Sequence, residues 1–185
     1  MSEDILPGYT RISDVLKPFS KFDNINLEVL NNAADRGTRV HDFCNAYANN
    51  IFIGDIDEDC KGYVDSFIKW YDENVESLIE SEKRLYDPFL MVTGKFDMIV
   101  KLKSSGQVTL IDIKTPSSIS KMWGLQLSVY FHLIKHELRI SVENVMVLQL
   151  SKYGKNAKKI LYNDTKKHFR LFLSALNLHE YINQK

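Results

Sequence analysis

Cysteine is scarce in this sequence, and its scarcity excludes several kinds of site. The chain holds only Cys44 and Cys60, which form no CxxC pair and no cluster with metal-ligand spacing. An iron–sulfur cluster or a structural zinc site is therefore not expected. The pattern favours two reduced thiols on the buried faces of helices in an intracellular protein.

Long hydrophobic runs are also missing. No window approaches the roughly 18 uninterrupted apolar residues that a membrane span needs. The N-terminus, residues 1–8, includes Glu3 and Asp4 and lacks the apolar run of a secretory signal. We therefore expect a cytoplasmic protein that does not act at a membrane.

No linker rich in proline, glycine or serine interrupts the chain, and no internal repeat or low-complexity tract is present. The hydrophobic fraction of 44% is typical of a chain that can bury a core. We predict a single domain over residues 1–185, because this length fits one domain of ordinary size.

Neither sign of charge dominates the chain, which carries 24 basic and 24 acidic residues. The distribution is uneven: residues 1–82 hold 17 acidic and 7 basic residues, whereas residues 150–185 hold 2 acidic and 8 basic ones. A polyanion could be guided to the basic end. Solvated surface lysines explain the same asymmetry, so charge alone does not decide between the two.

Hydrophobic periodicity predicts a mixed α/β fold. Residues 12–17 are expected to form a short helical turn, and longer helices are expected over 27–48 with Asn26 as N-cap, 63–78, 121–137 and from about 163–165 to 182. Strands are expected over 80–87, 90–102, 107–114 and 145–150. The economical arrangement is a mixed sheet with helices on both faces, in which 107–114 and 145–150 pair in parallel.

The strand 107–114 contains the first chemically suggestive pair. Alternate side chains of a strand point to one face, so Asp112 and Lys114 project together while Ile113 is buried opposite. A carboxylate binds a hard cation such as Mg²⁺, and a lysine orients a water or offsets charge on a phosphoryl transition state. The same pattern also fits a surface ion pair.

Asp97 lies in the preceding strand, which a Gly-containing hairpin over residues 101–106 joins to the strand of Asp112. Antiparallel neighbours lie about 5 Å apart, so the two carboxylates can meet over one cation. The alternative is a strand-end Asp that faces water.

Two helical pairs fit the same site. Gly37 costs about 1 kcal/mol in mid-helix relative to alanine, which suggests close packing, and His41 one turn later could supply a ring nitrogen to a metal. Gln126 and Tyr130 share one helix face and could donate hydrogen bonds to phosphate or base. A structural His, a surface Gln and a half-buried Tyr are the plainer interpretations.

Taken in order, these motifs resemble the PD-(D/E)xK nuclease superfamily, in particular its RecB-type and lambda-exonuclease-like branch. The matching elements, within about residues 33–150, are Gly37-x-x-x-His41, Gly94-x-x-Asp97, Asp112-x-Lys114 and Gln126-x-x-x-Tyr130. The stretch Glu82–Tyr86 resembles the family's first core strand. Phe96 stands where the literal motif has proline. The resemblance implies a restriction-endonuclease-like core, followed here by a basic C-terminal strand and helix over 150–185.

The resemblance also implies roles. Asp97 and Asp112 would bind one or two Mg²⁺ or Mn²⁺ ions, joined by His41 and the carbonyl of Ile113. Lys114 would be the catalytic lysine, and Glu82 would position it or help to hold a second metal. The residues expected to support the site or touch DNA are Gln126, Tyr130, Lys121, Lys152 and Lys155.

We therefore expect a metal-dependent deoxyribonuclease, and within that class an exonuclease, that acts in recombination, repair or phage replication alongside a recombination or replication partner protein. A binding module without chemistry is one alternative, favoured by the basic residues after position 150. A structure-specific endonuclease or resolvase of the same fold is another.

Overall fold

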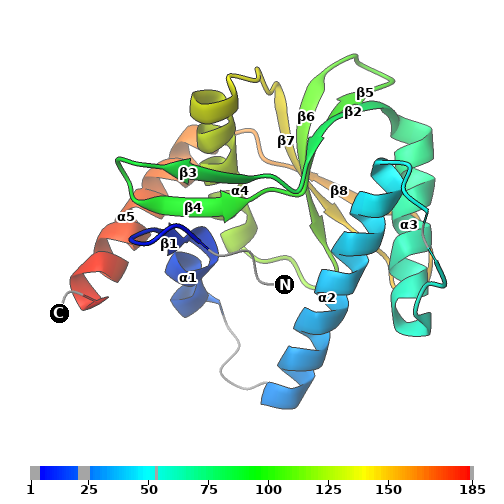
Figure 1. Ribbon diagram of the computed structural model, residues 1–185, viewed down its shortest axis with the longest axis horizontal. Coiled ribbons are helices and arrows are strands. Elements are labelled where there is room, and N and C mark those ends of the chain that lie inside the picture. Colours follow the sequence, from blue (N-terminus) through cyan, green and yellow to red (C-terminus); the bar gives the residue numbers. More distant parts are fainter. Residues whose placement is uncertain (1–4, 21–25, 53, 184–185) are drawn as a thin grey trace.

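The structure is a computed structural model that describes residues 5–20, 26–52 and 54–183 (Figure 1). Its α-helices are α1 (Ile12–Leu16), α2 (Leu27–Ala48), α3 (Glu58–Asn74), α4 (Met122–Leu133) and α5 (Thr165–Asn183). A 3-10 turn (Lys17–Phe19) follows α1, and a π-helical turn (Ile134–Leu138) extends α4. The strands are β1 (Thr10–Arg11), β2 (Val75–Ser81), β3 (Arg84–Asp87), β4 (Val92–Lys95), β5 (Met98–Leu102), β6 (Val108–Lys114), β7 (Asn144–Gln149) and β8 (Lys158–Leu161).

The strands form two mixed sheets. The larger sheet has the order β2-β5-β6-β7-β8, and the smaller one has the order β1-β4-β3. In the larger sheet β6 and β7 are parallel and the other neighbours are antiparallel. The parallel pair follows from the crossover through α4, since a chain that leaves one end of a strand must return to start its parallel neighbour. The predicted α/β class, the hairpin and the parallel pairing are confirmed.

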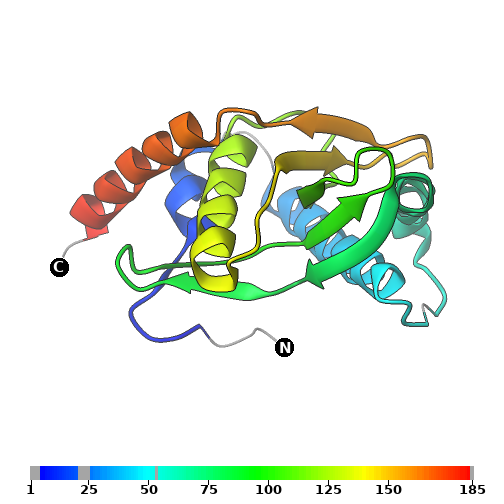
Figure 2. The same cartoon turned by 90° about the horizontal axis from the view of Figure 1, so that it is seen from above.

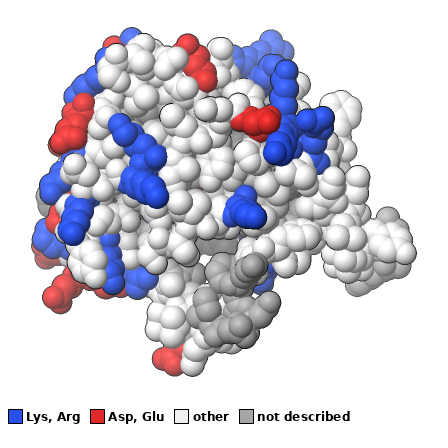
Figure 3. All heavy atoms as spheres, turned by 180° about the vertical axis from the view of Figure 1, so that it is seen from behind, with Lys and Arg blue, Asp and Glu red and all other residues white. Residues whose placement is uncertain are grey.

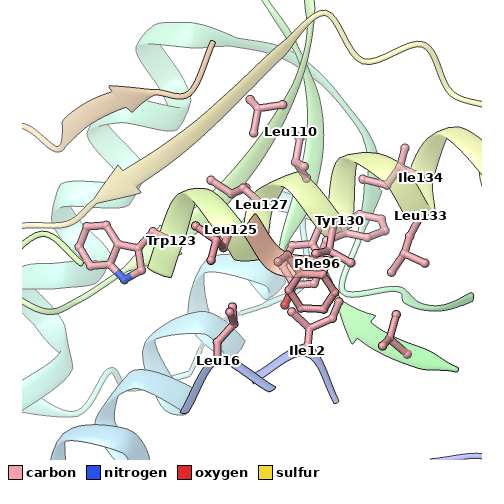
Figure 4. Packing of buried hydrophobic residues seen from close by; sticks show 14 of the residues in the cluster. Ile12, Leu16, Phe96, Leu110, Trp123, Leu125, Leu127, Tyr130, Leu133 and Ile134 are labelled. Carbon is pink, nitrogen blue, oxygen red and sulfur yellow. The ribbon is translucent and has the colours of Figure 1, made fainter. Parts of the chain in front are cut away.

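Helices cover both faces of the larger sheet (Figure 2). On one face, Val40 and Cys44 of α2 and Phe67 of α3 pack against Ile111 and Ile113 of β6. On the other face lies α4, whose residues are buried almost all round because α1 and α5 cover the side turned away from the sheet. Figure 4 shows this second layer.

Figure 4 places Leu127 of α4 toward Leu110 of β6, with Ile12 and Leu16 of α1 on the opposite side of the helix. Leu110 and Ile111 thus serve different cores, as the alternation of a strand requires. Continuing the alternation turns Asp112 and Lys114 toward α4.

The second long helix is shorter than its hydrophobic spacing predicts. Periodicity extends to Leu78, but α3 ends at Asn74 and Val75 begins β2. The Asn74 amide donates to the carbonyl of Trp70, and the Asn74 carbonyl accepts from the N–H of Lys103, which ends the helix and starts the sheet edge. Pairing with β5 therefore makes residues 75–81 a strand, although the helical spacing of apolar residues happens to continue to Leu78.

The predicted strands 80–87 and 90–102 are each broken in two, which is a second correction. The first breaks after Ser81, where Glu82 takes a φ of 50°. The second breaks between Lys95 and Met98. At these breaks the hairpin of β3 and β4 leaves the larger sheet and joins β1 instead (Figure 1). Two hydrogen bonds join the two breaks: the N–H of Glu82 donates to the carbonyl of Asp97 at 2.9 Å, and the N–H of Phe96 donates to the carbonyl of Lys83 at 3.4 Å.

Cys44 and Cys60 are free and buried in α2 and α3, as predicted. Within the described part of the chain, no helix combines the length and apolar character that crossing a membrane requires.

Gly62 allows α3 to approach the turn after β7, because a β-carbon there would overlap the backbone carbonyl of Lys152. Gly62→Ala should therefore lower the free energy of unfolding by about 1–3 kcal/mol, the usual cost of overpacking. Urea denaturation measures this, with Gly54→Ala as control because a β-carbon at Gly54 meets nothing within 4 Å. Equal midpoints for the two variants would show that the contact is easily relieved.

Candidate active site

The β5–β6 hairpin places Asp97 opposite Asp112. The ladder pairs Met98 with Ile111, so Asp97 and Asp112 are the next pair just past its end. Both carboxylates are buried. Because β5 begins only at Met98, the side chain of Asp97 accepts the hydrogen bond that a strand carbonyl would otherwise accept from β6. Its Oδ2 accepts the N–H of Ile113 at 2.5 Å. The carbonyl of Ile113 faces the same side, because the N–H and C=O of one strand residue point together. Its predicted role as a metal ligand fits this direction.

His41 reaches the same carboxylate from α2. Its Nδ1 lies 3.1 Å from Asp97 Oδ1. The expected close packing at Gly37, one turn earlier, is not found: a β-carbon there would meet only Thr115 Oγ1, at an ordinary 3.8 Å. Of the two motif glycines, Gly94 is the tightly packed one, since a β-carbon there would lie 2.5 Å from Cε1 of Tyr130.

Asp112 and Lys114 project to one face, as predicted. Lys114 Nζ lies 2.7 Å from Asp112 Oδ2, close enough for an ion pair but not aligned for a hydrogen bond. That buried oxygen has no hydrogen-bond donor among the described residues. A buried carboxylate oxygen without a donor is costly unless a cation faces it.

A chain of hydrogen bonds holds the Lys114 ammonium from the α4 side. Lys114 Nζ donates to Gln126 Oε1 at 3.2 Å, and Gln126 Nε2 donates to the hydroxyl of Tyr130 at 2.8 Å. Tyr130 is buried, and its ring packs on Gly94. The structure thus gives both α4 residues a supporting role at Lys114, and their contact with DNA stays a prediction.

Glu82 lies at the sheet break, beside His41 and Asp97. One candidate ligand atom from each of these three residues lies within 4.8 Å of the others. Glu82 forms an ion pair with Lys95. Sequence reasoning did not single out Lys95, although its place between Gly94 and Asp97 in the motif was the available signal.

The charges of the site shift one another's pKa values. Burial raises the pKa of Asp112 to about 6, with Lys114 opposing the shift and Asp97 adding to it. Burial acts in the same direction on Asp97, but the positive charges of His41 and Lys114 prevail and lower its pKa. Burial lowers the pKa of Lys114, yet the two carboxylates outweigh it and the pKa is raised. The lysine is therefore an ammonium at neutral pH.

The pKa of His41 is also raised, because Asp97 outweighs the burial that acts against its charged form. The pKa of Glu82 is raised, chiefly by burial. Excess negative charge in a buried place favours any added positive charge, whether a proton or a metal ion.

The donor set fits a hard divalent cation. One imidazole and the carboxylates of Glu82 and Asp97 are ligands that Mg²⁺ and Mn²⁺ accept, and Asp112 lies opposite Asp97 in the hairpin. A second acidic group, Asp57 and Asp59 with Cys60, is a weaker candidate. Its carboxylates are exposed and already face the guanidinium of Arg39, at 2.6 and 2.9 Å.

The lysines expected to contact DNA lie outside this cluster. Lys121 is exposed at the start of α4, and Lys152 and Lys155 are exposed on the turn that follows β7. That turn adjoins the site, because Gln149 at the end of β7 pairs with Lys114.

No protein-family model and no curated protein matches this sequence. Among solved structures, the chain is similar to the crystal structure of SSO0001, with a TM-score of 0.46 and 13% identity over 96% of this chain and 79% of that one.

Removing the Lys114 ammonium should destabilise the fold, because the buried carboxylates would lose the positive charge that compensates them. Without metal, Lys114→Met should lower the free energy of unfolding by about 3–5 kcal/mol, the usual effect of breaking a buried pair. Adding Asp112→Asn to the same chain should recover much of the loss, because a buried charge is removed. Denaturation in EDTA measures both variants.

The matched control is Lys101→Met, which breaks the exposed ion pair with Glu76 at 2.8 Å. Surface pairs contribute at most about 1 kcal/mol, so this variant should unfold close to wild type. If Lys114→Met were as stable as Lys101→Met, the ammonium would not be compensating the buried carboxylates.

Proposed function

We propose that this chain is a divalent-metal-dependent deoxyribonuclease, most simply an exonuclease. The observation that carries the proposal is the meeting of the partly buried His41 and Lys114 with the buried Asp97 and Asp112 in one cluster. These residues come from α2, from the start of β5 and from the end of β6. The family that the motifs resemble uses this set of groups for phosphodiester hydrolysis.

Asp97, Asp112 and His41 would hold the metal, with the Ile113 carbonyl directed to the same side and Glu82 within reach. When bound, such an ion polarises a phosphoryl oxygen and acidifies a water. Asp97 also fixes the end of β6, because it accepts the N–H of Ile113.

Lys114 contributes an ammonium group whose position is fixed. Its ammonium lies beside Asp112 and donates to Gln126, which leaves donor capacity for a phosphate oxygen or the attacking water. A fixed positive charge at that point stabilises the extra negative charge of the transition state. Gln126 and Tyr130 keep the ammonium from turning away.

A binding module without chemistry is the second candidate, and the basic stretch after β7 favours it. Eight basic residues against two acidic ones in 150–185 suit a phosphate backbone. Such a module has no use for two buried carboxylates beside a lysine. In either case we propose that the protein acts on DNA inside the cell, with a recombination or replication protein as its partner.

The nuclease proposal is tested with linear DNA labelled at one end, as single and double strands, in Mg²⁺, Mn²⁺ or EDTA. Wild type should degrade it, and EDTA should stop the reaction. Asp97→Ala and Lys114→Ala should each slow it at least about a hundredfold, since each removes a preorganised charge. Asp59→Ala, in the other acidic group, should keep the wild-type rate. Full activity in Lys114→Ala would overturn the mechanism.

Metal binding gives a second test that does not need catalysis. Titration calorimetry with Mn²⁺ should show binding to wild type and to Asp59→Ala, and none to Asp97→Ala, because Asp97 belongs to the group of His41 and Glu82, whereas Asp59 belongs to the exposed group that already faces Arg39. The opposite pattern, with binding lost in Asp59→Ala, would move the metal to the exposed group and contradict the assignment.

A further inference from the structure

A cleft opens one residue beyond Lys114. Thr115 and Ser117 line it from the segment after β6, Gln149 from the end of β7, and Lys152, Tyr153 and Lys158 from the turn and strand that follow. Its volume is about 250 Å³. Gln149 pairs with Lys114 in the sheet and donates to the Pro116 carbonyl at 2.7 Å, so the cleft lies beside the end of β6 that carries the candidate active site.

The cleft is positively charged. Two lysines line it, and no acidic side chain is among its described lining residues. A third cation lies behind Tyr63, which lines the cleft. The Arg36 guanidinium carbon is 5.8 Å from the centre of the Tyr63 ring. The Arg36 Nε is buried and has no hydrogen-bond partner among the described residues. Figure 3 shows that the face carrying β8 bears more Lys and Arg than Asp and Glu.

Tyr153 projects an aromatic face at the rim. Its side chain is 71% exposed, although a large aromatic ring gains from burial. The Lys152 ammonium lies 4.8 Å from the ring centre, so a cation and a stacking surface stand together.

The turn that carries Tyr153 is held firmly on α3. The N–H of Ser151 donates to the hydroxyl of Ser66 at 3.1 Å, and Lys69 donates to the carbonyl of Gly154 at 2.8 Å. Gly62 brings the helix against the same turn. The exposed ring is therefore presented by a preorganised turn, which lowers the entropy lost when a ligand stacks on it.

We propose that this cleft binds single-stranded DNA and leads it to the candidate active site, with one base stacked on Tyr153 and phosphates at Lys152 and Lys158. The inference rests on the proposed function, since it names the form of the substrate. Single-strand sites combine a basic groove with an exposed aromatic ring, because an unpaired base offers its face. In a duplex the base faces are already stacked. A space of about 250 Å³ also holds part of one strand rather than a double helix.

Fluorescence anisotropy in EDTA tests the inference without any cleavage. The probes are a labelled oligothymidylate, the same sequence as a hairpin duplex, and the corresponding oligouridylate. Wild type should bind the DNA single strand more tightly than the duplex. Tyr153→Ala should weaken single-strand binding about tenfold, Tyr153→Phe should restore it, and the duplex should be little affected. The control Tyr181→Ala removes an equally exposed tyrosine on α5.

The lysines have a separate readout. Lys152→Ala and Lys158→Ala should each reduce the slope of log affinity against log salt by about 0.7, the value for one phosphate contact on a single strand. Lys135→Ala, at the far end of α4, should leave the slope unchanged.

Wild-type affinity in Tyr153→Ala, or an equal loss for duplex and single strand, would overturn the inference. Preference for oligouridylate would replace DNA by RNA as the ligand and would also count against it. Failure of the proposed function looks different: single-strand binding that depends on Tyr153 with no cleavage in Mg²⁺ or Mn²⁺ would support the cleft and contradict the nuclease.

Discussion

The structure depends on one constraint: two buried carboxylates lie beside a single, mostly buried ammonium. Asp97 and Asp112 carry two negative charges at the end of the β5–β6 hairpin, whereas Lys114 supplies one positive charge. An uncompensated buried charge costs several kcal/mol, so every nearby group is placed to reduce it. His41 faces Asp97, the N–H of Ile113 donates to it, and α4 holds the lysine through Gln126. One negative charge is still left over, and a proton shared with His41 or a divalent cation matches it.

The same constraint explains where the sheets separate. If β2 continued into β3, and β4 into β5, the two long strands would pair through their backbones along their whole length. Backbone hydrogen bonds would then take the place that the side chains of the site now occupy. Instead, the chain breaks at Glu82, with a φ of 50°, and again before Met98. A non-glycine residue in this conformation costs on the order of 1 kcal/mol or more and is typical of functional sites. The break frees the side chain of Asp97 to take the N–H of Ile113, and it brings Glu82 to His41.

Local rules were sufficient for the parts of the site that lie within one element or one hairpin. The period of two in a strand predicts that Asp112 and Lys114 share a face, and the short hairpin predicts that Asp97 lies opposite. The helices, the α/β class and the parallel β6–β7 pair also follow from periodicity and connection length. The rest depends on long-range packing. Nothing local distinguishes Gly37, which is loosely packed, from Gly94, which lies against Tyr130, and the end of α3 is decided by pairing with β5.

The position of the cleft relative to the charged cluster separates the two candidate functions. A module that only binds nucleic acid needs the basic, aromatic-edged cleft, and it would be at least as stable with apolar residues in place of the buried ion pair. The cleft, however, lies beside that ion pair: Thr115 lines it directly after Lys114, and Gln149 pairs with the lysine from the next strand. A strand lying in the cleft would bring its phosphates close to the Lys114 ammonium and the buried Asp112 carboxylate, which lie 2.7 Å apart. Binding alone gives no reason for that proximity, whereas hydrolysis of the bound strand requires it.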